Sequence, residues 1–197
     1  MPRPLILASS SLGKLREFAA FFQDHIPGWT LHLKPAELEV EETGTTFVEN
    51  ARLKATTVAK TLGEWTLADD SGLSVQALNG APGIHSARYA ATDAARIERL
   101  LKEMEGIPNR QATFHCALAL ADTQGQVRVQ VEGVCEGEIL TQPRGEGGFG
   151  YDPLFWVPEV GLTFAEMSPA QKAEIGHRGR ALQALKEQLL MLGTALG

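Results

Sequence analysis

The stretch PLILASSSLGKLREFAAFF (residues 4–22) begins with a short apolar run, continues with three serines and ends in a periodic segment. Residues 4–8 predict a buried strand, because short apolar runs bounded by turn residues are typical of one. Apolar side chains then recur from residue 12 to residue 22 at the spacing of one helix face. Ser11 is a natural N-cap for this helix. The stretch therefore predicts a strand, a turn and a helix in succession.

The rest of the chain predicts further strands and helices. Thr46 and Glu49 form a capping box for a helix that Gly63 ends. The other segments with a strand or helix pattern are strands at 29–33, 65–68 and 154–157, an antiparallel pair at 113–121 and 126–134, and helices at 92–105, from 168 onward and at 179–192. Because strands and helices alternate early and strands pair later, we expect an α/β fold with a mixed sheet.

The composition sets limits on the class of protein. Of the 197 residues, 44% are hydrophobic and 21% are charged, so a proper core is expected and disorder is not. No apolar run approaches the roughly 18 residues of a membrane helix, and we expect a cytoplasmic protein without a membrane partner. A net charge of -6 argues against a nucleic-acid duplex as partner, although a few local cations can still bind a small anion. Cys116 and Cys135 lack zinc-site spacing and are expected to be reduced thiols.

The serine-rich turn is the candidate phosphate-binding segment. At the start of the first predicted helix stand Ser9, Ser10, Ser11, Leu12, Gly13 and Lys14. The free N–H groups and positive dipole end of a helix N-terminus stabilise phosphate oxygens, and Lys14 adds a full charge. The alternative is a serine cap that binds no ligand. The segment is not a Walker A loop, because the flanking glycines are missing.

Acidic side chains provide the candidate metal ligands. Asp69 and Asp70 directly follow residues 65–68, and the sequence predicts that they lie in a turn at the end of that strand. Mg²⁺ prefers oxygen ligands, few of them from protein, and a nearby carboxylate can take a proton from an attacking water. The alternative is a turn in which aspartate only accepts from backbone N–H groups. By themselves, the pair Glu41-Glu42 and the later Lys54 indicate only a helix-dipole contact and a surface lysine.

A glycine-rich loop is the candidate base-binding segment. Glycines on both sides of Phe149 would let its ring stand free as a platform for a flat base. Asp152 can accept from base N–H groups, and His177 and Arg178 can donate to base carbonyl oxygens. The alternative is a core phenylalanine and a charged helix start. Residues 145–150 match G-x-G-x-x-G, but a strand pattern follows rather than a helix, so a Rossmann site is not expected.

Five motifs, in this order, resemble those of the inosine triphosphate pyrophosphatase family, which removes deaminated purine nucleotides. They are ETGTTFVENA (42–51) with Lys54, ADDSGL (68–73), PGIHSARY (82–89), GGFGYDP (147–153) and HRG (177–179). The resemblance implies an elongated α/β fold in which helices flank a long central mixed sheet. It also implies a single domain over residues 1–197, with two lobes and the active-site cleft between them, and a homodimer.

The resemblance further implies the roles of individual residues. Asp70 is the expected catalytic base, and the expected Mg²⁺ ligands are Glu42 and Asp70, with Asp69 as a further candidate. The residues expected to bind substrate are Ser9, Ser10, Ser11, Leu12, Gly13, Lys14, Lys54, Ser71, Phe149, Gly150, Tyr151, Asp152, Lys172, His177 and Arg178. The expected reaction is hydrolysis of ITP, dITP or XTP to the monophosphate and pyrophosphate. Mg²⁺ would neutralise the phosphates together with Lys14, Lys54 and Lys172.

One position departs from the family pattern and leaves alternatives open. The family has asparagine where this chain has Ser11, and serine lacks the amide donor. Residues 7–11 also resemble the opening of the related Maf nucleotide pyrophosphatases, so a Maf-like enzyme for modified pyrimidine nucleotides is one alternative. That family continues with proline and arginines, whereas this chain continues with Leu12-Gly13-Lys14. A nucleotide-binding module without catalysis is the other alternative.

Overall fold

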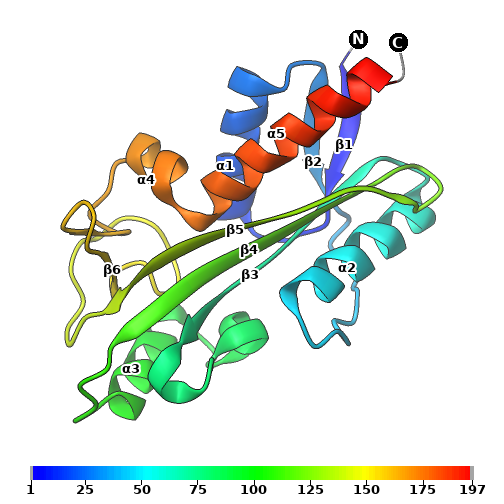
Figure 1. Ribbon diagram of the computed structural model, residues 1–197. Helices are drawn as coiled ribbons and strands as arrows, with labels where there is room; N and C mark the ends of the chain where they lie inside the picture. The colour runs from blue at the N-terminus through cyan, green and yellow to red at the C-terminus, as the bar shows by residue number, and fades with distance from the viewer. Residues whose placement is uncertain (1, 196–197) are drawn as a thin grey trace. The chain divides into compact units, whose positions relative to one another are not determined.

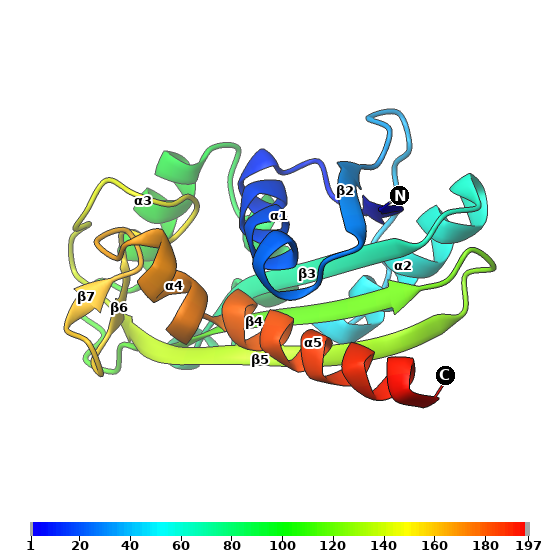
Figure 2. The same cartoon turned by 90° about the horizontal axis from the view of Figure 1, so that it is seen from above.

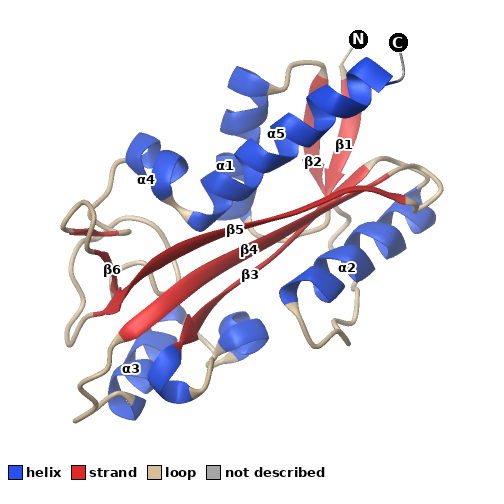
Figure 3. Cartoon of the chain, in the orientation of Figure 1, coloured by secondary structure: helices blue, strands red, loops and turns tan. Residues whose placement is uncertain are grey.

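The computed structural model describes the backbone of residues 2–195 and the side chains of residues 2–191 (Figure 1). Three residues of the predicted domain 1–197, namely Met1, Leu196 and Gly197, lie outside the described part. The strands are β1 (Arg3–Leu7), β2 (Trp29–Leu33), β3 (Thr66–Val75), β4 (Gln111–Ala121), β5 (Val127–Ile139), β6 (Phe155–Val157) and β7 (Leu162–Thr163). The α-helices are α1 (Leu12–His25), α2 (Phe47–Leu62), α3 (Asp93–Glu103), α4 (Pro169–Ile175) and α5 (His177–Ala195), and two short 3₁₀ helices span Gln76–Leu78 and Gly83–Arg88 (Figure 3).

The strands form one mixed sheet in the order β2-β1-β3-β4-β5-β6-β7. β1 runs parallel to both β2 and β3, whereas β6 runs antiparallel to β5 and β7. A turn at residues 122–126 joins β4 to β5. In this turn, the Gly125 N–H donates a hydrogen bond to the Asp122 carbonyl oxygen at 2.8 Å. Neighbouring strands joined by so short a turn run in opposite directions. The predicted α/β fold with a mixed sheet is confirmed.

The chain divides into two compact units. Unit 1 comprises Met1–Asp70, Cys116–Gly133 and Arg180–Gly197, and unit 2 comprises Ser71–His115 and Val134–Gly179. The boundaries between the units fall within β3, β4, β5 and α5. Among the described residues, no helix combines the length and apolar character that crossing a bilayer requires.

Unit 1 has helices on both faces of its strands. Figure 1 shows α1 and α5 on one face and α2 on the other. Side chains of β4 alternate between these faces, as in any strand. Those that pack with α1 and α5 are Cys116, Leu118 and Leu120, and those that pack with α2 are Ala117, Ala119 and Ala121. Alanines on both α2 and β4 leave little side-chain volume between helix and sheet.

Unit 2 has an aromatic core. The ring of Phe114 in β4 lies 4.6 Å from the ring of Phe155 and 5.4 Å from that of Phe164, measured between centroids. Leu100 and Met104, from α3 and the residue after it, complete the same cluster. In Figure 2, β6 and β7 lie next to α4, and Ile175 of α4 packs against this core.

β3 is longer than predicted, and this changes the setting of the acidic pair. The sequence predicted a strand at 65–68 followed by a turn, but β3 continues through Asp69 and Asp70 to Val75. The turn was predicted because Asp-Asp-Ser-Gly has the composition of one. The strand persists because lysine side chains reach both carboxylates, Lys14 that of Asp69 and Lys54 that of Asp70, so the charges are compensated where they are buried.

Smaller differences concern the ends of elements. The Thr46 side chain caps α2 by accepting from the Glu49 N–H at 3.1 Å, but the Glu49 carboxylate accepts from the Thr45 N–H at 2.7 Å, so the predicted capping box is only half formed. The predicted helix at 92–105 is α3, which ends earlier, at Glu103. The two-residue strand β7 was not predicted, because so short a segment carries no alternating pattern.

Candidate active site

The serine-rich segment forms the entry to α1. Ser11 is the N-cap, and its Oγ accepts from the Lys14 N–H at 3.3 Å. The Oγ of Ser9 accepts from the Ser11 N–H at 3.1 Å. Both serines therefore hold the shape of the turn, which leaves Ser10 and Leu12 exposed beside the helix N-terminus. The predicted cap at Ser11 is confirmed, and phosphate binding by residues 9–14 stays a prediction.

Lys14 extends from the first turn of α1 to a buried carboxylate. Its Nζ donates to Asp69 Oδ1. Asp69 is 1% exposed, and its Oδ2 accepts from the Cys116 thiol, with 3.1 Å between sulfur and oxygen. Asp69 thus fixes the head of Lys14 next to the candidate phosphate-binding turn.

Asp70 forms the second acidic group, together with Lys54 and Glu42. Lys54 Nζ donates to Asp70 Oδ1 at 2.9 Å and to Glu42 Oε1 at 2.7 Å. Burial raises the pKa of Asp70, and the nearby Glu42 raises it further, against the opposing charge of Lys54. Burial lowers the pKa of Lys54, but Asp70 and Glu42 outweigh this effect and raise it. Lys54 is therefore a buried cation shared by two carboxylates, not the surface lysine that its helix position alone indicated.

The donor atoms of this group fit a hard divalent cation. Asp70 is 7% exposed, and its Oδ2 is buried and accepts no hydrogen bond from the described residues. Glu42 supplies a second carboxylate on the same lysine. Mg²⁺ takes one or two protein carboxylates and completes its shell with water and phosphate oxygens. Two carboxylates, one with an unused buried oxygen, match that requirement, and no group of three or more metal-ligating side chains occurs in the described part of the chain.

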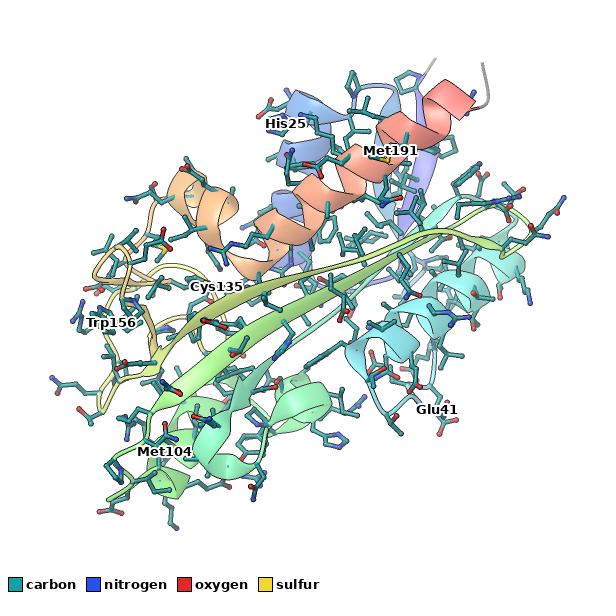
Figure 4. All side chains as sticks on the ribbon, in the orientation of Figure 1. His25, Glu41, Met104, Cys135, Trp156 and Met191 are labelled. Carbon is teal, nitrogen blue, oxygen red and sulfur yellow. The ribbon has the colours of Figure 1, made fainter. Side chains whose placement is uncertain are left out.

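The two glutamates of the acidic pair differ in their surroundings. Glu42 is partly buried and contacts Lys54, whereas Glu41 is exposed on the loop before α2 (Figure 4). Asn50 of α2 fixes this loop, because its Oδ1 accepts from the Gly44 N–H at 2.8 Å and the residue is fully buried. A side chain at Gly44 would lie 2.6 Å from that oxygen, so the close approach requires glycine. Asn50 lies within the quoted motif but was not predicted to have a role.

In unit 2, the glycine-rich loop is organised around Asp152. Asp152 is 3% exposed, and its Oδ2 accepts from the Phe149 N–H at 2.9 Å and from Lys172 Nζ at 2.6 Å. A Cβ on Gly148 would lie 1.9 Å from this oxygen, and the φ of Gly148 is +73°. Asp93 at the start of α3 accepts from the Gly150 N–H at 2.8 Å. The loop is therefore held by two carboxylates, of which only Asp152 was predicted to matter.

The Phe149 ring stands out from this loop with cations beside it. It is 37% exposed, as expected for a stacking platform. Lys172 Nζ lies 5.0 Å from the ring centroid and Arg178 Cζ lies 5.7 Å from it. Lys172 thus belongs with the Phe149 loop, since it contacts Asp152 and this ring.

His177 and Tyr151 are fixed by the core of unit 2. The His177 ring is stacked on Phe114, with centroids 4.7 Å apart and an 11° angle between planes, and it lies 5.7 Å from Phe164. α5 begins at His177, as the alternative of a helix start predicted, but His177 is 4% exposed and Arg178 is 5% exposed, so both side chains are buried. Tyr151 is also buried, and its hydroxyl donates to the Ser86 carbonyl at 2.9 Å.

The predicted residues thus fall into two groups. The group in unit 1 contains Lys14, Glu42, Lys54, Asp69 and Asp70, and the group in unit 2 contains Phe149, Asp152, Lys172, His177 and Arg178. Ser71 follows Asp70 directly in β3 and is partly buried. The sequence did not point to the side chains that support these groups, namely Asn50, Asp93, Phe114, Cys116 and Phe164. Phe114 and Cys116 belong to the apolar pattern of β4, which indicates core packing and gives no signal for such a role.

The sequence model of the Ham1 family matches residues 5–188. The chain belongs to the Ham1 family. A relative from Nostoc sp., named dITP/XTP pyrophosphatase, is 57% identical over 185 residues, which are 94% of this chain and 93% of the relative. A relative of the same name from Thermosynechococcus vestitus is 58% identical over 182 residues, 92% of this chain and 93% of the relative.

Solved Ham1 structures agree with the fold. The structure of a HAM1 protein from Coxiella burnetii superimposes with a TM-score of 0.86 at 43% identity, covering 97% of this chain and 100% of that one. The Ham1 membership and the names of its relatives confirm the predicted family. Nothing in these matches favours the Maf-like alternative.

Proposed function

We propose that this protein hydrolyses non-standard purine nucleoside triphosphates (ITP, dITP and XTP) to the monophosphate and pyrophosphate, with Asp70 as the catalytic base. The observation that carries the proposal is the buried group of Asp70, Lys54 and Glu42, in which Asp70 Oδ2 accepts no hydrogen bond from the described residues. The relatives named dITP/XTP pyrophosphatase support this choice of substrates.

The metal ion in this proposal is Mg²⁺, held by Glu42 and Asp70. A bound Mg²⁺ would polarise the phosphate oxygens and neutralise their charge. Asp69 was a further candidate ligand, but it bonds Lys14 and Cys116, so we assign it to holding Lys14. This pair can offer oxygen ligands to a divalent metal ion, because Glu42 and Asp70 approach the same lysine and Asp70 Oδ2 accepts no hydrogen bond from the described residues.

The residues of unit 1 bind the triphosphate and activate the water. The N-terminus of α1 offers N–H groups to phosphate oxygens, and Lys14 and Lys54 supply positive charge. Asp70 accepts a proton from the attacking water, as a carboxylate near the reacting group can. Phosphoryl chemistry requires mainly positioning and charge neutralisation, which this set can supply.

The residues of unit 2 recognise the purine. Phe149 offers an exposed ring face for stacking, worth about 1–3 kcal/mol per base. Donors from His177 and Arg178 suit the 6-keto oxygen of hypoxanthine and xanthine, whereas the 6-amino group of adenine would face donors and lose a hydrogen bond. Lys172 contacts Asp152 and the Phe149 ring. We therefore assign it to the part of the substrate that lies next to the Phe149 loop, which is the end that carries the base.

The experiment that tests the function is pyrophosphate release from ITP in the presence of Mg²⁺, by wild type and by Asp70→Asn. We expect turnover by wild type and a loss of about 10²- to 10⁴-fold in kcat for the variant, the usual contribution of a general base. Binding of ITP without any pyrophosphate release would favour the non-catalytic nucleotide-binding module, whereas turnover at an unchanged rate in Asp70→Asn would exclude Asp70 as the catalytic base.

The setting of the enzyme completes the proposal. We infer that the protein is a homodimer and that each chain forms a single domain over residues 1–197. We also infer that it acts in the cytoplasm on free nucleotides. The net charge of -6 supports a small-molecule substrate over a nucleic-acid duplex, since duplex binding uses a broad basic face.

A further inference from the structure

Cys116 is a buried thiol that donates to a buried carboxylate. Its Sγ lies 3.1 Å from Asp69 Oδ2, and both residues are 1% exposed. An ionised carboxylate only accepts hydrogen bonds, and each oxygen removed from water needs a donor. Cys116 is such a donor to Asp69 Oδ2, and Lys14 donates to Asp69 Oδ1.

This arrangement sets the orientation of the carboxylate. The torsion that rotates an aspartate carboxylate is broad, with no strongly preferred value of its own. A donor on Oδ2 therefore fixes the plane of the group and, with it, the direction in which Oδ1 faces Lys14. The lysine side chain is a flexible four-carbon stem, so its charged head takes the place that its partner sets.

We propose that Cys116 is a positioning residue, which holds Lys14 in place through Asp69. The proposal rests on the proposed function, in which Lys14 binds the triphosphate. Cys116 makes no bond to substrate, and no bond forms or breaks at its sulfur. Its position on β4 beside Leu118 and Leu120 would otherwise mark it as a core residue only.

The chemistry of the donor gives the first test. Cys116→Ala and Cys116→Val remove the donor, and valine also fills the volume, whereas Cys116→Ser keeps a hydroxyl donor. With ITP and Mg²⁺ we expect alanine and valine to lower kcat/KM about tenfold, mostly through KM, which is the size of one lost hydrogen bond. Serine should stay within about threefold of wild type. Equal losses in all three variants, or none in any of them, would overturn the proposal.

Cys135 provides a matched control. It is also a buried thiol on a strand, β5 (Figure 4), but it belongs to the core of unit 2 and its Sγ lies 3.8 Å from the Glu136 carbonyl oxygen. Cys135→Ala removes a thiol of the same size from a core. It should leave KM for ITP within about twofold, even if it lowers the melting temperature. A rise in KM equal to that of Cys116→Ala would mean that core packing alone explains the effect.

A double-mutant cycle tests whether the effect passes through the lysine. In a Lys14→Met background, Cys116→Ala should cause no further loss of kcat/KM, because the residue on which it acts is gone. A further loss of about tenfold in that background would overturn the proposal.

Crystal structures of the variants keep this inference separate from the proposed function. If wild type releases no pyrophosphate from ITP, the proposed function fails, but the position of Lys14 can still be observed. We expect the contact between Lys14 and Asp69 to be lost in Cys116→Ala and kept in Cys116→Ser. An unchanged contact in Cys116→Ala would overturn the positioning role even if the enzyme is active.

Discussion

Asp69 and Asp70 are consecutive residues of β3 whose carboxylates contact different lysines, Lys14 of α1 and Lys54 of α2. Successive side chains of a strand point to opposite faces, and in unit 1 these two helices lie on opposite faces. The two carboxylates are therefore not interchangeable. Asp69 accepts hydrogen bonds from Lys14 and from the Cys116 thiol, whereas the buried Oδ2 of Asp70 accepts none from the described residues.

The raised pKa of Asp70 predicts a gain in stability when its charge is removed. Burial raises this pKa in the folded protein above its unfolded value, so the contribution of the group to stability is lost as the pH rises through the folded-state pKa. In EDTA at pH 7, Asp70→Asn should therefore have a higher free energy of unfolding than wild type. The difference should disappear below about pH 4, where the unfolded aspartate is also protonated. Urea unfolding at several pH values measures this, and a less stable variant at pH 7 would contradict it.

Glu42 should control the Mg²⁺ requirement. In Glu42→Gln, the Mg²⁺ concentration for half-maximal activity should rise about ten- to hundredfold, because one charged oxygen ligand is lost while Asp70 remains. The neighbouring Glu41 is exposed and gives a matched control. Titration of Mg²⁺ against pyrophosphate release should leave Glu41→Gln unchanged. The same shift in both variants would indicate general electrostatics and not a ligand.

Phe149 should contribute binding energy for the base. Phe149→Ala should raise KM for ITP by about 5- to 100-fold, which corresponds to a stacking energy of about 1–3 kcal/mol. Phe149→Trp keeps an aromatic face and should bind within a few-fold of wild type. Steady-state kinetics with ITP compares the two, and an unaltered KM in the alanine variant would remove Phe149 from the base site.

Gly148 should be required for the shape of the same loop. A Cβ there would lie 1.9 Å from Asp152 Oδ2, so Gly148→Ala must displace the carboxylate that holds Phe149 and Lys172. We expect KM for ITP to rise at least tenfold, as for the loss of a charged hydrogen bond. Gly161 has a similar φ of +69° with nothing within 4 Å of its Cβ, so Gly161→Ala reproduces the backbone strain without the clash. Equal kinetics in the two variants would contradict the role of the Asp152 contacts.

The fold was predictable where local patterns determine it. Ser11 caps α1 and Gly63 ends α2 with a φ of +67°, because cap residues act through backbone groups within one turn. The extent of β3 was not predictable in this way. Asp69 and Asp70 stay in the strand because Lys14 and Lys54, which lie far from them in sequence, reach the two carboxylates.

The candidate site was predictable in its residues and less so in their contacts. The sequence predicted Asp152 as an acceptor for the base. In the structure, its Oδ2 accepts hydrogen bonds from the Phe149 N–H and from Lys172 Nζ. The roles of Cys116 and Asn50 depend on contacts 47 and 6 positions away in sequence, which no short pattern encodes. A core cysteine and a helix asparagine look the same in sequence whether or not they orient a functional group.

A panel of ITP, XTP, dUTP, ATP and GTP measures which base the enzyme prefers. Pyrophosphate release is measured for each nucleotide at equal concentration with saturating Mg²⁺. The donors of His177 and Arg178 and the exposed Phe149 ring predict that ITP and XTP are hydrolysed with the highest kcat/KM, and ATP at least about tenfold more slowly. A preference for dUTP over ITP would contradict the account.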